Sequence, residues 1–600
     1  MENLSRDTTG WPPGAALASR PSPLWASLDR RGALDRPWLR AYEPGVPATL
    51  TYPDQPLYHF LDEAAATYPN RPALIFLGRR IAYRSLADQV NRFANALLAL
   101  GIQKGDRVAV HLPNSPQFVI AYYGALRAGA VVSALSPLYT ESELEHQLND
   151  CGAETIVTLT LTYNHIKAIQ PRTAAKRLIV TNIKDYFPPQ LRMLFTLFRE
   201  KKEGHRAAVQ PGDLLLPALL RHHADTPPSV DVQADDLALL QYTGGTTGLP
   251  KAAMLSHRTL ATNVVQAASW NTAAQEGREV ILGVLPFFHV YAQQIAMNQA
   301  IYLGASLILF PRYERRPLLK AIDRYRPTLF PGVTTLYVNL MDDPDLARHD
   351  LRSIKLCLSG AMTLPQEVQE KLETISGGRL IEGYGMTETG PLTHASPVHG
   401  QRKAGSIGVP VTDTDARILS IEDGETELPP GQVGEICVRG PQLMQGYWNR
   451  PAETAQMIRD GWLHTGDLGR MDDDGFFFVV DRLKDMIIAG GFKIFPREVE
   501  EILYAHPKIK EAALVGIKDP TYGELPKAFI VLKEGETLTP EELIAYCRAQ
   551  LASYKVPKQV EFRAELPKSL VGKILKRKLA EEHAVAHSGQ PLPGPAPARA

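Results

Sequence analysis

The chain has 600 residues, which is too long for a single compact core, so we expect at least two domains. Lys plus Arg and Asp plus Glu are equal at 65 each, which excludes a net field that would draw the chain to nucleic acid. The hydrophobic fraction of 44% and the charged fraction of 22% are ordinary for a soluble globular protein, so binding of a specific small molecule is the default expectation.

Neither a secretory signal nor a membrane span is predicted. The chain starts without a basic segment followed by an apolar one. Its most apolar stretches, residues 118–135 and 281–310, are interrupted by Arg127 and by Pro286. The four cysteines are scattered without a C-x-x-C pair, which fits structural thiols in a reducing compartment. We therefore expect a soluble, cytoplasmic protein.

Helix and strand patterns alternate from Pro56 onward, after a lead-in over residues 1–50 that is rich in Pro, Arg and Ser and is predicted to be extended. The pattern Ser85-x-x-Asp88 predicts the start of a helix that Gly101 ends. Residues 107–112 then have the composition of a strand.

A second capping pattern, Thr140-x-x-Glu143, predicts a helix that stops near Gly152, and residues 155–158 follow as a strand. Strands alternating with helices are typical of parallel sheets covered by helices. The sequence therefore predicts an α/β protein.

Residues 186–206 form an unusual segment that is both apolar and basic. A helix packed on the body of the protein is one interpretation. The other is an amphipathic segment that contacts a membrane surface or a partner that delivers lipid. Both interpretations stay open at this point.

The stretch from Tyr242 to Lys251 is the most informative part of the chain. Its glycines and threonines leave backbone N–H groups and hydroxyls available, as a loop that wraps a polyphosphate requires, and Lys251 adds a positive charge. It is not a Walker A loop, because Leu249 and Pro250 separate the last glycine from the lysine. An apolar run before it and a helical pattern over 260–265 after it predict a strand, a glycine loop and a helix, an arrangement that binds anions. A flexible linker is the alternative.

A domain boundary is predicted within residues 471–492, where a turn at 472–475, a strand and a charged cluster at 481–485 follow one another. We expect a large domain over 51–480 and a small α+β domain over 481–585, with helices near 498–504 and 540–551 and strands near 512–517 and 528–532. The Pro- and Ala-rich tail over 586–600 is predicted to be disordered.

Four further segments stand in a fixed order along the chain with the glycine loop. They are Glu382-Gly-Tyr-Gly-Met-Thr-Glu388, Trp462-Leu-His-Thr-Gly-Asp467, Asp481-Arg-Leu-Lys-Asp485 and Val571-Gly-Lys-Ile-Leu-Lys576. Together the five segments resemble the adenylate-forming superfamily of acyl-CoA synthetases, luciferases and nonribosomal adenylation domains, over residues 55–580. The Gly-Gly form of the loop and the 186–206 segment are most similar to bacterial long-chain fatty acyl-CoA ligases.

This resemblance implies an enzyme that uses ATP and Mg²⁺ to convert a carboxylate into an acyl-adenylate, and then transfers the acyl group to coenzyme A. It assigns to Lys573 the role of a cation that lies between the carboxylate and the α-phosphate. These two anions repel each other, and the cation lowers that repulsion. It assigns the metal to Thr243 and Glu388. It assigns the phosphates to Gly244, Gly245, Thr246, Thr247, Gly248 and Lys251.

The same resemblance places ribose and adenine. A carboxylate accepts two hydrogen bonds, which suits the paired ribose hydroxyls, and the residue implied is Asp467, with Arg482 beside it. Tyr384 is implied to stack on adenine. The remaining residues of the nucleotide pocket are Gly360, Ala361, Gly385, Met386 and Thr387.

The resemblance also implies a hinge at Lys484, about which the small domain rotates between the two half-reactions. After this rotation, Gly490 and Gly491 would face the active site and form part of the path for the pantetheine arm of CoA. Lys573 is then needed for adenylation and dispensable for thioester formation.

The acid is expected to be a fatty acid. His289 resembles a residue near the carboxylate and the tunnel mouth, although a packed core histidine is an equal alternative. Small or apolar residues follow at 332–336 and 359–362, without a charge that would recognise an α-amino group. Two departures from the family pattern are Ala252, where Gly often follows the loop lysine, and Gln293, where some long-chain enzymes have a gating tryptophan.

Other functions stay open on these residues. They are a medium-chain or aryl acid CoA ligase, a ligase that loads a carrier protein, a luciferase-like monooxygenase, and a non-catalytic protein that binds fatty acid or nucleotide. The expected partners are a fatty acid, ATP and CoA, with no nucleic acid. Peripheral membrane contact through residues 186–206 and a homodimer are also left open.

Overall fold

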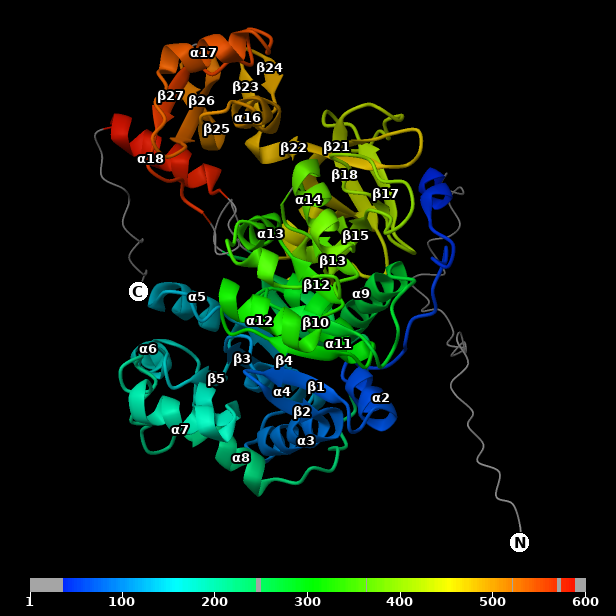
Figure 1. Cartoon of the computed structure of the whole chain (residues 1–600), viewed down its shortest axis with the longest axis vertical. Helices are drawn as coiled ribbons and strands as arrows, with labels where there is room; N and C mark the ends of the chain where they lie inside the picture. Colours follow the sequence, from blue (N-terminus) through cyan, green and yellow to red (C-terminus); the bar gives the residue numbers. More distant parts are fainter. Residues whose placement is uncertain (1–35, 244–249, 363, 521, 569–573, 589–600) are drawn as a thin grey trace.

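The computed structural model describes residues 36–243, 250–362, 364–520, 522–568 and 574–588 (Figure 1). Within these ranges a large N-terminal body contains three sheets, and a small C-terminal body, at the top of Figure 1, contains a fourth. The predicted α/β class, with a large domain and a small α+β domain, is confirmed. The exact boundary between residues 480 and 481 stays a prediction.

The first large sheet is parallel in its centre and antiparallel at its edges. Its strand order is β16-β15-β14-β13-β12-β10-β11-β1-β2. The strands are β1 (Pro72–Phe76), β2 (Arg79–Ala82), β10 (Val280–Gly283), β11 (Ser306–Leu309), β12 (Leu329–Gly332), β13 (Leu356–Ser359), β14 (Arg379–Gly385), β15 (Leu392–Ala395) and β16 (Val409–Pro410).

The second large sheet has the order β19-β9-β8-β4-β3-β5-β6-β7. All neighbours pair in parallel except β9, which is antiparallel to both β8 and β19. Its strands are β3 (Arg107–His111), β4 (Val131–Ala134), β5 (Thr155–Leu159), β6 (Arg177–Thr181), β7 (Leu214–Leu215), β8 (Leu237–Tyr242), β9 (Ala252–Ser256) and β19 (Gly446–Tyr447).

The predicted order of strand, glycine loop and helix is wrong in one respect. The loop leads into β9, which pairs back onto β8 with Tyr242 opposite Ala252, and the helix α9 (His257–Trp270) begins only after that strand. The physical reason is that Ala252–Ser256 is almost wholly buried and finds its partners on β8. The N-terminus of α9, capped by the Ser256 hydroxyl, therefore does not open directly from the loop.

Helices cover the two large sheets. Every residue of α4 is buried, in a core shared by both sheets. The helices of this body are α2 (His59–Thr67), α3 (Tyr83–Ala99), α4 (Pro116–Arg127), α5 (Glu141–Cys151), α6 (Tyr163–Ile169), α7 (Pro189–Phe198), α8 (Leu216–His222), α9, α10 (Val290–Ala292), α11 (Gln299–Tyr302), α12 (Arg315–Tyr325), α13 (Thr334–Met341), α14 (Gln366–Ser376) and α15 (Pro451–Met457). None of the helices in the described ranges is long and apolar enough to span a bilayer.

Two capping patterns had different outcomes. Thr140 and Glu143 form the predicted capping box, and Gly152 ends α5 in the left-handed conformation. The prediction for Ser85 is wrong, because α3 already begins at Tyr83 and has no side-chain cap. Tyr83 is buried and its hydroxyl donates to the carbonyls of Ala300 and Ala305, so tertiary contacts set this helix start.

A third sheet holds β17 (Asp415–Leu419), β18 (Gly434–Arg439), β20 (Ile458–Arg459), β21 (Trp462–Met471) and β22 (Phe477–Arg482). The end of the lead-in packs on this sheet. Trp38, in the 3-10 helix η1 (Pro37–Ala41), is buried against Phe477, and Arg36 pairs with Asp415 at 2.7 Å. The expectation of an extended lead-in is therefore wrong for residues 37–41, which are helical, and residues 1–35 lie outside the described ranges.

The small body is an antiparallel sheet extended by one parallel strand and covered by helices. The predicted elements of this body are present, with the exception that α18 continues to Ser588, into the tail that was predicted to be disordered. Its elements are β23 (Ile487–Ala489), β24 (Phe492–Ile494), α16 (Pro496–Tyr504), β25 (Ile509–Asp519), β26 (Gly523–Leu532), α17 (Pro540–Arg548), β27 (Gln559–Phe562) and α18 (Lys576–Ser588).

The connection between the two bodies is tied to both of them. Strand β22 pairs with β21 in the third sheet, and it also holds the first turn of α16. The Arg497 backbone N–H donates to the Asp481 carboxylate at 2.7 Å, and its guanidinium donates to the Val479 carbonyl at 2.9 Å. The short helix η7 (Leu483–Asp485) follows.

Candidate functional site

A polar cluster around a buried carboxylate lies where the first and third sheets meet. Asp467 of β21 and Arg482 of β22 are register partners, and Arg482 Nε lies 3.0 Å from the Asp467 carboxylate. The Tyr384 hydroxyl, from β14, donates to the other carboxylate oxygen at 2.8 Å. Because Asp467 is only 6% exposed, its charge needs these two partners. Three of the predicted nucleotide residues, from separate segments, are thus brought together.

A second buried carboxylate follows β14 in the same segment. Glu388 lies in the short helix η6 (Thr387–Thr389) and accepts a hydrogen bond of 2.6 Å from the Tyr447 hydroxyl. Burial raises the pKa of Glu388, against the opposing effect of that hydrogen bond. The ammonium of Lys251 lies over the Tyr447 ring, 5.3 Å from its centroid.

Tyr447 therefore connects Glu388 to the end of the glycine loop, although the sequence analysis did not identify it. It belongs to β19, which pairs with β9, so Tyr447 stands opposite Ala253. Only this long-range strand pairing places it there. A Gly-Tyr-Trp stretch at 446–448 was the sole local signal.

The predicted phosphate loop and the predicted catalytic lysine are not among the residues that the structure describes. Residues 244–248 and Lys573 lie outside the described residues. The residues that flank both segments are described. The Thr243 N–H donates to the Lys251 carbonyl at 2.9 Å, and the backbones of Lys568 and Ile574 form an isolated antiparallel β-bridge. The two ends of each segment therefore lie side by side.

Tyr291 connects the ends of β12 and β13 and lies against Gly360, and the sequence analysis gave it no role. Its hydroxyl donates to the Leu358 carbonyl at 2.7 Å and to the Gly332 carbonyl at 3.1 Å, at the ends of β13 and β12. A Cβ atom at Gly360 would lie 3.2 Å from the Tyr291 ring, so this position has little room for a side chain. Ala361 has a φ of 66°, which is unusual for a residue other than glycine.

His289 caps the short helix α10, where its Nδ1 accepts from the Tyr291 N–H at 3.3 Å. Loss of hydration lowers the pKa of His289 to about 4, so the imidazole is neutral at pH 7. A neutral ring suits a hydrogen-bonding role near a carboxylate and does not suit a fixed positive charge. Its predicted catalytic role stays a prediction.

Gln293 is fully buried and fixed by hydrogen bonds. Its amide donates to Gln241 at 3.0 Å and to the Phe287 carbonyl at 2.8 Å, in the π-helical turn η4 (Gln293–Asn298). Beside this turn an apolar cavity of about 40 Å³ is lined by residues that include Ile295, Phe330 and Leu392. Ligand pockets measure roughly 300–1,000 Å³, so this cavity does not accommodate a long acyl chain without rearrangement.

The residues predicted for the second half-reaction belong to the small body. Gly490 and Gly491 form the exposed turn between β23 and β24, with positive φ values of 57° and 84°. The Gly490 N–H donates to the Tyr522 carbonyl at 2.8 Å. Lys484, in η7, is exposed between the two bodies.

Comparisons with known proteins show the family to which the chain belongs. The chain matches the family model for AMP-binding enzymes over residues 61–448 and the model for their C-terminal domain over 498–573. It is 46% identical to a long-chain-fatty-acid–CoA ligase of Bacillus subtilis, over 92% of this chain and 99% of the relative. It is 35% identical to 4-coumarate-CoA ligase 1 of Narcissus pseudonarcissus, over 87% of this chain and 93% of that protein.

Among solved structures, ATP-bound MatB from Rhodopseudomonas palustris superposes with a TM-score of 0.78 at 29% identity, over 89% of this chain and 100% of MatB. The apo form of MatB gives a TM-score of 0.68 over the same shares. The described arrangement of the chain is therefore closer to the ATP-bound form.

Proposed function

Because the chain belongs to the family of AMP-binding enzymes, we propose that it is a ligase that joins a long-chain fatty acid to coenzyme A. In the first step a carboxylate oxygen attacks the α-phosphorus of ATP, and pyrophosphate leaves. In the second step the sulfur of CoA attacks the acyl carbonyl, AMP leaves with the bonding electrons, and the thiol proton is released. The contacts of the buried Asp467 carboxylate with Tyr384 and Arg482 support this proposal most, since they bring together, from three separate segments, residues to which the resemblance assigns the nucleotide.

In this proposal the pocket residues keep the roles that the resemblance implies. The Asp467 carboxylate accepts from the ribose hydroxyls, with Arg482 donating to ribose or phosphate. Tyr384 stacks on adenine, and the 244–251 loop holds the β- and γ-phosphates. Lys573 stabilises the charge that develops between carboxylate and α-phosphate during adenylation.

Mg²⁺ fits the residues assigned to it. A hard cation takes oxygen ligands, and the Thr243 hydroxyl and the Glu388 carboxylate are such donors. Burial raises the pKa of Glu388, which reflects the cost of a buried negative charge, and a bound cation would relieve that cost. When bound with ATP, the ion neutralises phosphate charge.

An assay of acyl-CoA formation tests the proposal. It contains ATP, Mg²⁺ and CoA and compares fatty acids of increasing chain length, together with benzoate and coumarate. A maximum at long chains is expected. A maximum at coumarate would favour the aryl ligase, an alternative supported by the 35% identity to 4-coumarate-CoA ligase 1. Pyrophosphate release without acyl-CoA formation would indicate that the acceptor is a carrier protein and not CoA. Absence of pyrophosphate release with every acid would overturn the proposal.

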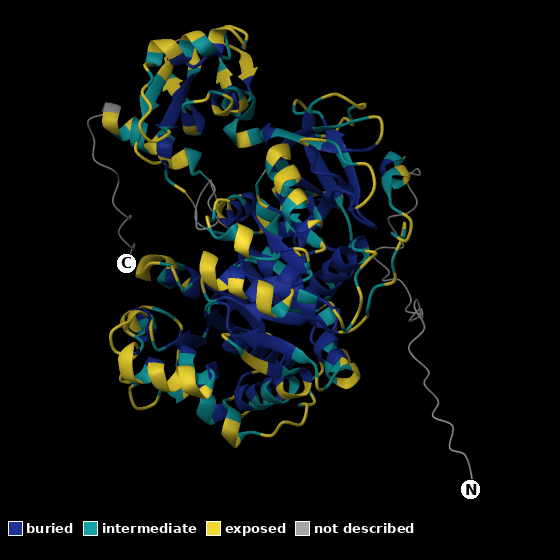
Figure 2. Ribbon diagram, in the orientation of Figure 1, coloured by how far each residue is buried: buried dark blue, intermediate teal, exposed yellow. Residues whose placement is uncertain are grey.

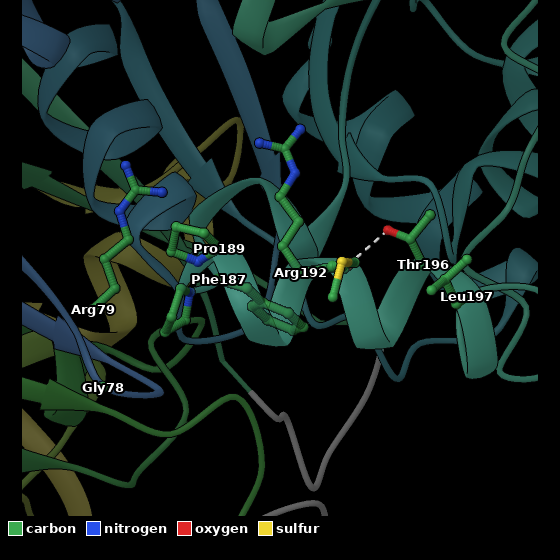
Figure 3. Close-up of a pocket in the computed structure, with 9 residues that line it drawn as sticks. Gly78, Arg79, Phe187, Pro189, Arg192, Thr196 and Leu197 are labelled. Atoms are coloured by element: carbon green, nitrogen blue, oxygen red, sulfur yellow. Dashed lines mark hydrogen bonds between the residues drawn. The ribbon is translucent and has the colours of Figure 1, made fainter.

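The proposal includes contact of α7 with an anionic phospholipid surface. Figure 2 shows this helix as largely exposed, and its exposed side chains include Met193, Leu197 and Phe198, at 58%, 67% and 70% exposure. Beside it lies an open groove of about 810 Å³, flanked by Arg79 and Arg192 (Figure 3). Apolar side chains next to arginines match a bilayer with acidic headgroups, from which a fatty acid could be drawn.

Co-sedimentation with vesicles of neutral or partly anionic phospholipid tests this contact. The double variant Leu197→Ser/Phe198→Ser is expected to lose binding to anionic vesicles several-fold, while activity on a short soluble acid stays unchanged. Leu138→Ser serves as a matched control, because Leu138 is 70% exposed outside this helix. Equal sedimentation of the three proteins would contradict the contact.

A cytoplasmic location, with the enzyme peripheral at the inner face of the membrane, completes the proposal. So does a homodimer, which light scattering on the purified protein tests directly. A mass of 66.2 kDa would correspond to the monomer and would exclude the dimer at that concentration.

A further inference from the structure

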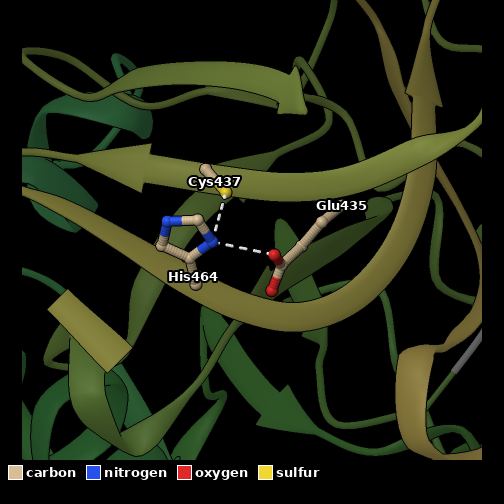
Figure 4. A group of neighbouring side chains, drawn as sticks. All are labelled: Glu435, Cys437 and His464. Atoms are coloured by element: carbon tan, nitrogen blue, oxygen red, sulfur yellow. Dashed lines mark hydrogen bonds and ion pairs between the residues drawn. The ribbon is translucent and has the colours of Figure 1, made fainter. Parts of the chain in front are cut away.

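Three polar side chains are clustered on one face of the third sheet (Figure 4). Glu435 and Cys437 stand two residues apart on β18, and His464 on β21 is the register partner of Cys437. Their exposures are 8%, 0% and 6%, so the cluster is enclosed by protein. None of the three has a role in the function proposed above.

Glu435 uses both carboxylate oxygens inside this cluster. One accepts a hydrogen bond of 2.8 Å from His464 Nδ1, and the other accepts one of 2.9 Å from the Gly466 backbone N–H. Hydrogen bonds to a buried carboxylate are stronger than neutral ones. Glu435 therefore fixes the strand segment that immediately precedes Asp467.

That segment is a bulge in the pairing of β18 with β21. Glu435 and Cys437 are two residues apart, whereas their partners Leu468 and His464 are four apart, so β21 has two extra residues here. Gly466 has a φ of 69°, and a Cβ atom there would meet no described atom within 4 Å, so backbone conformation rather than space favours glycine.

The bulge determines where Asp467 points. The Thr465 hydroxyl donates to the Ile436 carbonyl at 2.7 Å, and the Asp467 N–H donates back to that hydroxyl at 3.1 Å. Glu435 holds the middle of the bulge at Gly466. The Ile436 carbonyl and the Glu435 carboxylate of β18 therefore anchor the successive residues Thr465 and Gly466, and the Asp467 carboxylate faces Tyr384 and Arg482.

The geometry is that of a hydrogen-bonded cluster rather than a metal site. Ligands of a tetrahedral zinc ion, at about 2.0–2.1 Å from the metal, stand about 3.3 Å apart, whereas His464 Nδ1 and the Glu435 oxygen are 2.8 Å apart. Burial raises the pKa of the Cys437 thiol, which favours the protonated sulfur over a thiolate ligand.

We propose that Glu435 is a positioning residue for ATP, which acts by holding the 465–467 bulge so that Asp467 accepts the ribose hydroxyls. This inference rests on the proposed function, because it requires that Asp467 binds ribose. Loss of the Glu435 side chain releases the Gly466 N–H and lets the bulge relax. The effect then falls on ribose recognition and not on the chemical step.

The test compares ATP with 2′-deoxy-ATP in acyl-adenylate formation, as the ratio of their kcat/KM values. Glu435→Ala is expected to raise KM for ATP about 10-fold, to leave kcat within about twofold, and to lower the ratio toward one. Glu435→Gln should restore most of the ratio, because its amide oxygen can still accept from the Gly466 N–H. Glu427→Ala, an exposed carboxylate outside the cluster, is the matched control.

The outcomes separate the two proposals. If the wild-type enzyme does not distinguish ATP from 2′-deoxy-ATP, the ribose role of Asp467 fails and this inference fails with it. If the wild-type enzyme distinguishes them and Glu435→Ala does so equally, only the positioning role is overturned. Should Glu435→Ala not fold, Glu435→Asp shortens the side chain and is expected to weaken its contact with the Gly466 N–H, so an unchanged ratio in that variant would also contradict the inference.

Discussion

The ribose side of the pocket and the glycine turn of the small body are built in opposite ways. Asp467 is buried, and its carboxylate is bound by two side chains from separate strands. Gly490 and Gly491 are exposed and have positive φ values. In the proposed reaction AMP stays bound through both steps, whereas the small body moves between them. The difference teaches that, in the proposed reaction, the buried region holds what is common to both half-reactions, and the exposed region serves only one.

Replacement of Lys573 by Ala should have the largest effect and should divide the half-reactions most clearly. Adenylation is expected to fall about 10²- to 10³-fold, because the cation between two anions is lost. Thioester formation from supplied acyl-adenylate and CoA is expected to stay within a few-fold of the wild-type rate. Pyrophosphate release and acyl-CoA formation, measured separately, check this. Equal loss in both assays would break the comparison.

Asp467→Ala should weaken both half-reactions, since the nucleotide is present in both. Removal of two hydrogen bonds to a charged acceptor is expected to raise KM for ATP about 30- to 100-fold. Isothermal titration with AMP should show a similar loss of affinity. Asp473→Ala, in the turn after β21, is a control that should leave both values unchanged. An effect confined to adenylation would argue against a nucleotide contact shared by both steps.

Gly491→Ala tests the exposed region alone. A Cβ atom at this position would have no described atom within 4 Å, so the strain comes from the φ of 84° and amounts to about 1–2 kcal/mol. Thioester formation is expected to fall about 10-fold, while adenylation stays within twofold. The ratio of the two rates in single-turnover assays is the measurement. Gly535→Ala, with a similar φ of 81° in another turn, is the matched control.

Glu382→Gln should produce the smallest effect, on the stability of the large body. Burial raises the pKa of Glu382 to about 8, so between its ordinary value and 8 the folded protein binds more protons than the unfolded chain. Its contribution to stability is complete at low pH and is lost as pH rises through 8. The wild-type Tm should therefore fall by a few degrees relative to the variant between pH 5 and pH 9. Parallel curves would contradict the assignment.

The sequence was most informative where the signal was local. The capping box of α5 and the turn at residues 472–475 are confirmed, because each depends on side chains within a few residues. The Asp472 carboxylate, for example, accepts the Phe476 N–H at 3.0 Å. Asp467, Tyr384 and Arg482 were found through the family resemblance, and the structure brings them together.

What the sequence missed depends on pairing between distant strands. Tyr447 reaches Glu388 only because β19 pairs with β9, and Trp38 is buried only because the lead-in returns to the third sheet. The strand β9 was also missed, because a helical pattern close behind it masked a short buried run. Local propensity does not encode such contacts.

The double attachment of β22 limits how this enzyme could be recombined with its relatives. A small domain exchanged at residue 482 would separate Arg497 from the Val479 carbonyl and the Asp481 carboxylate to which it donates hydrogen bonds. A hybrid joined instead in the turn at 472–475 would transfer β22 together with α16 and keep the contacts of Arg497. In that hybrid, β22 and β21 would come from different proteins and would have to pair. The useful crossover point therefore lies upstream of the predicted hinge at Lys484.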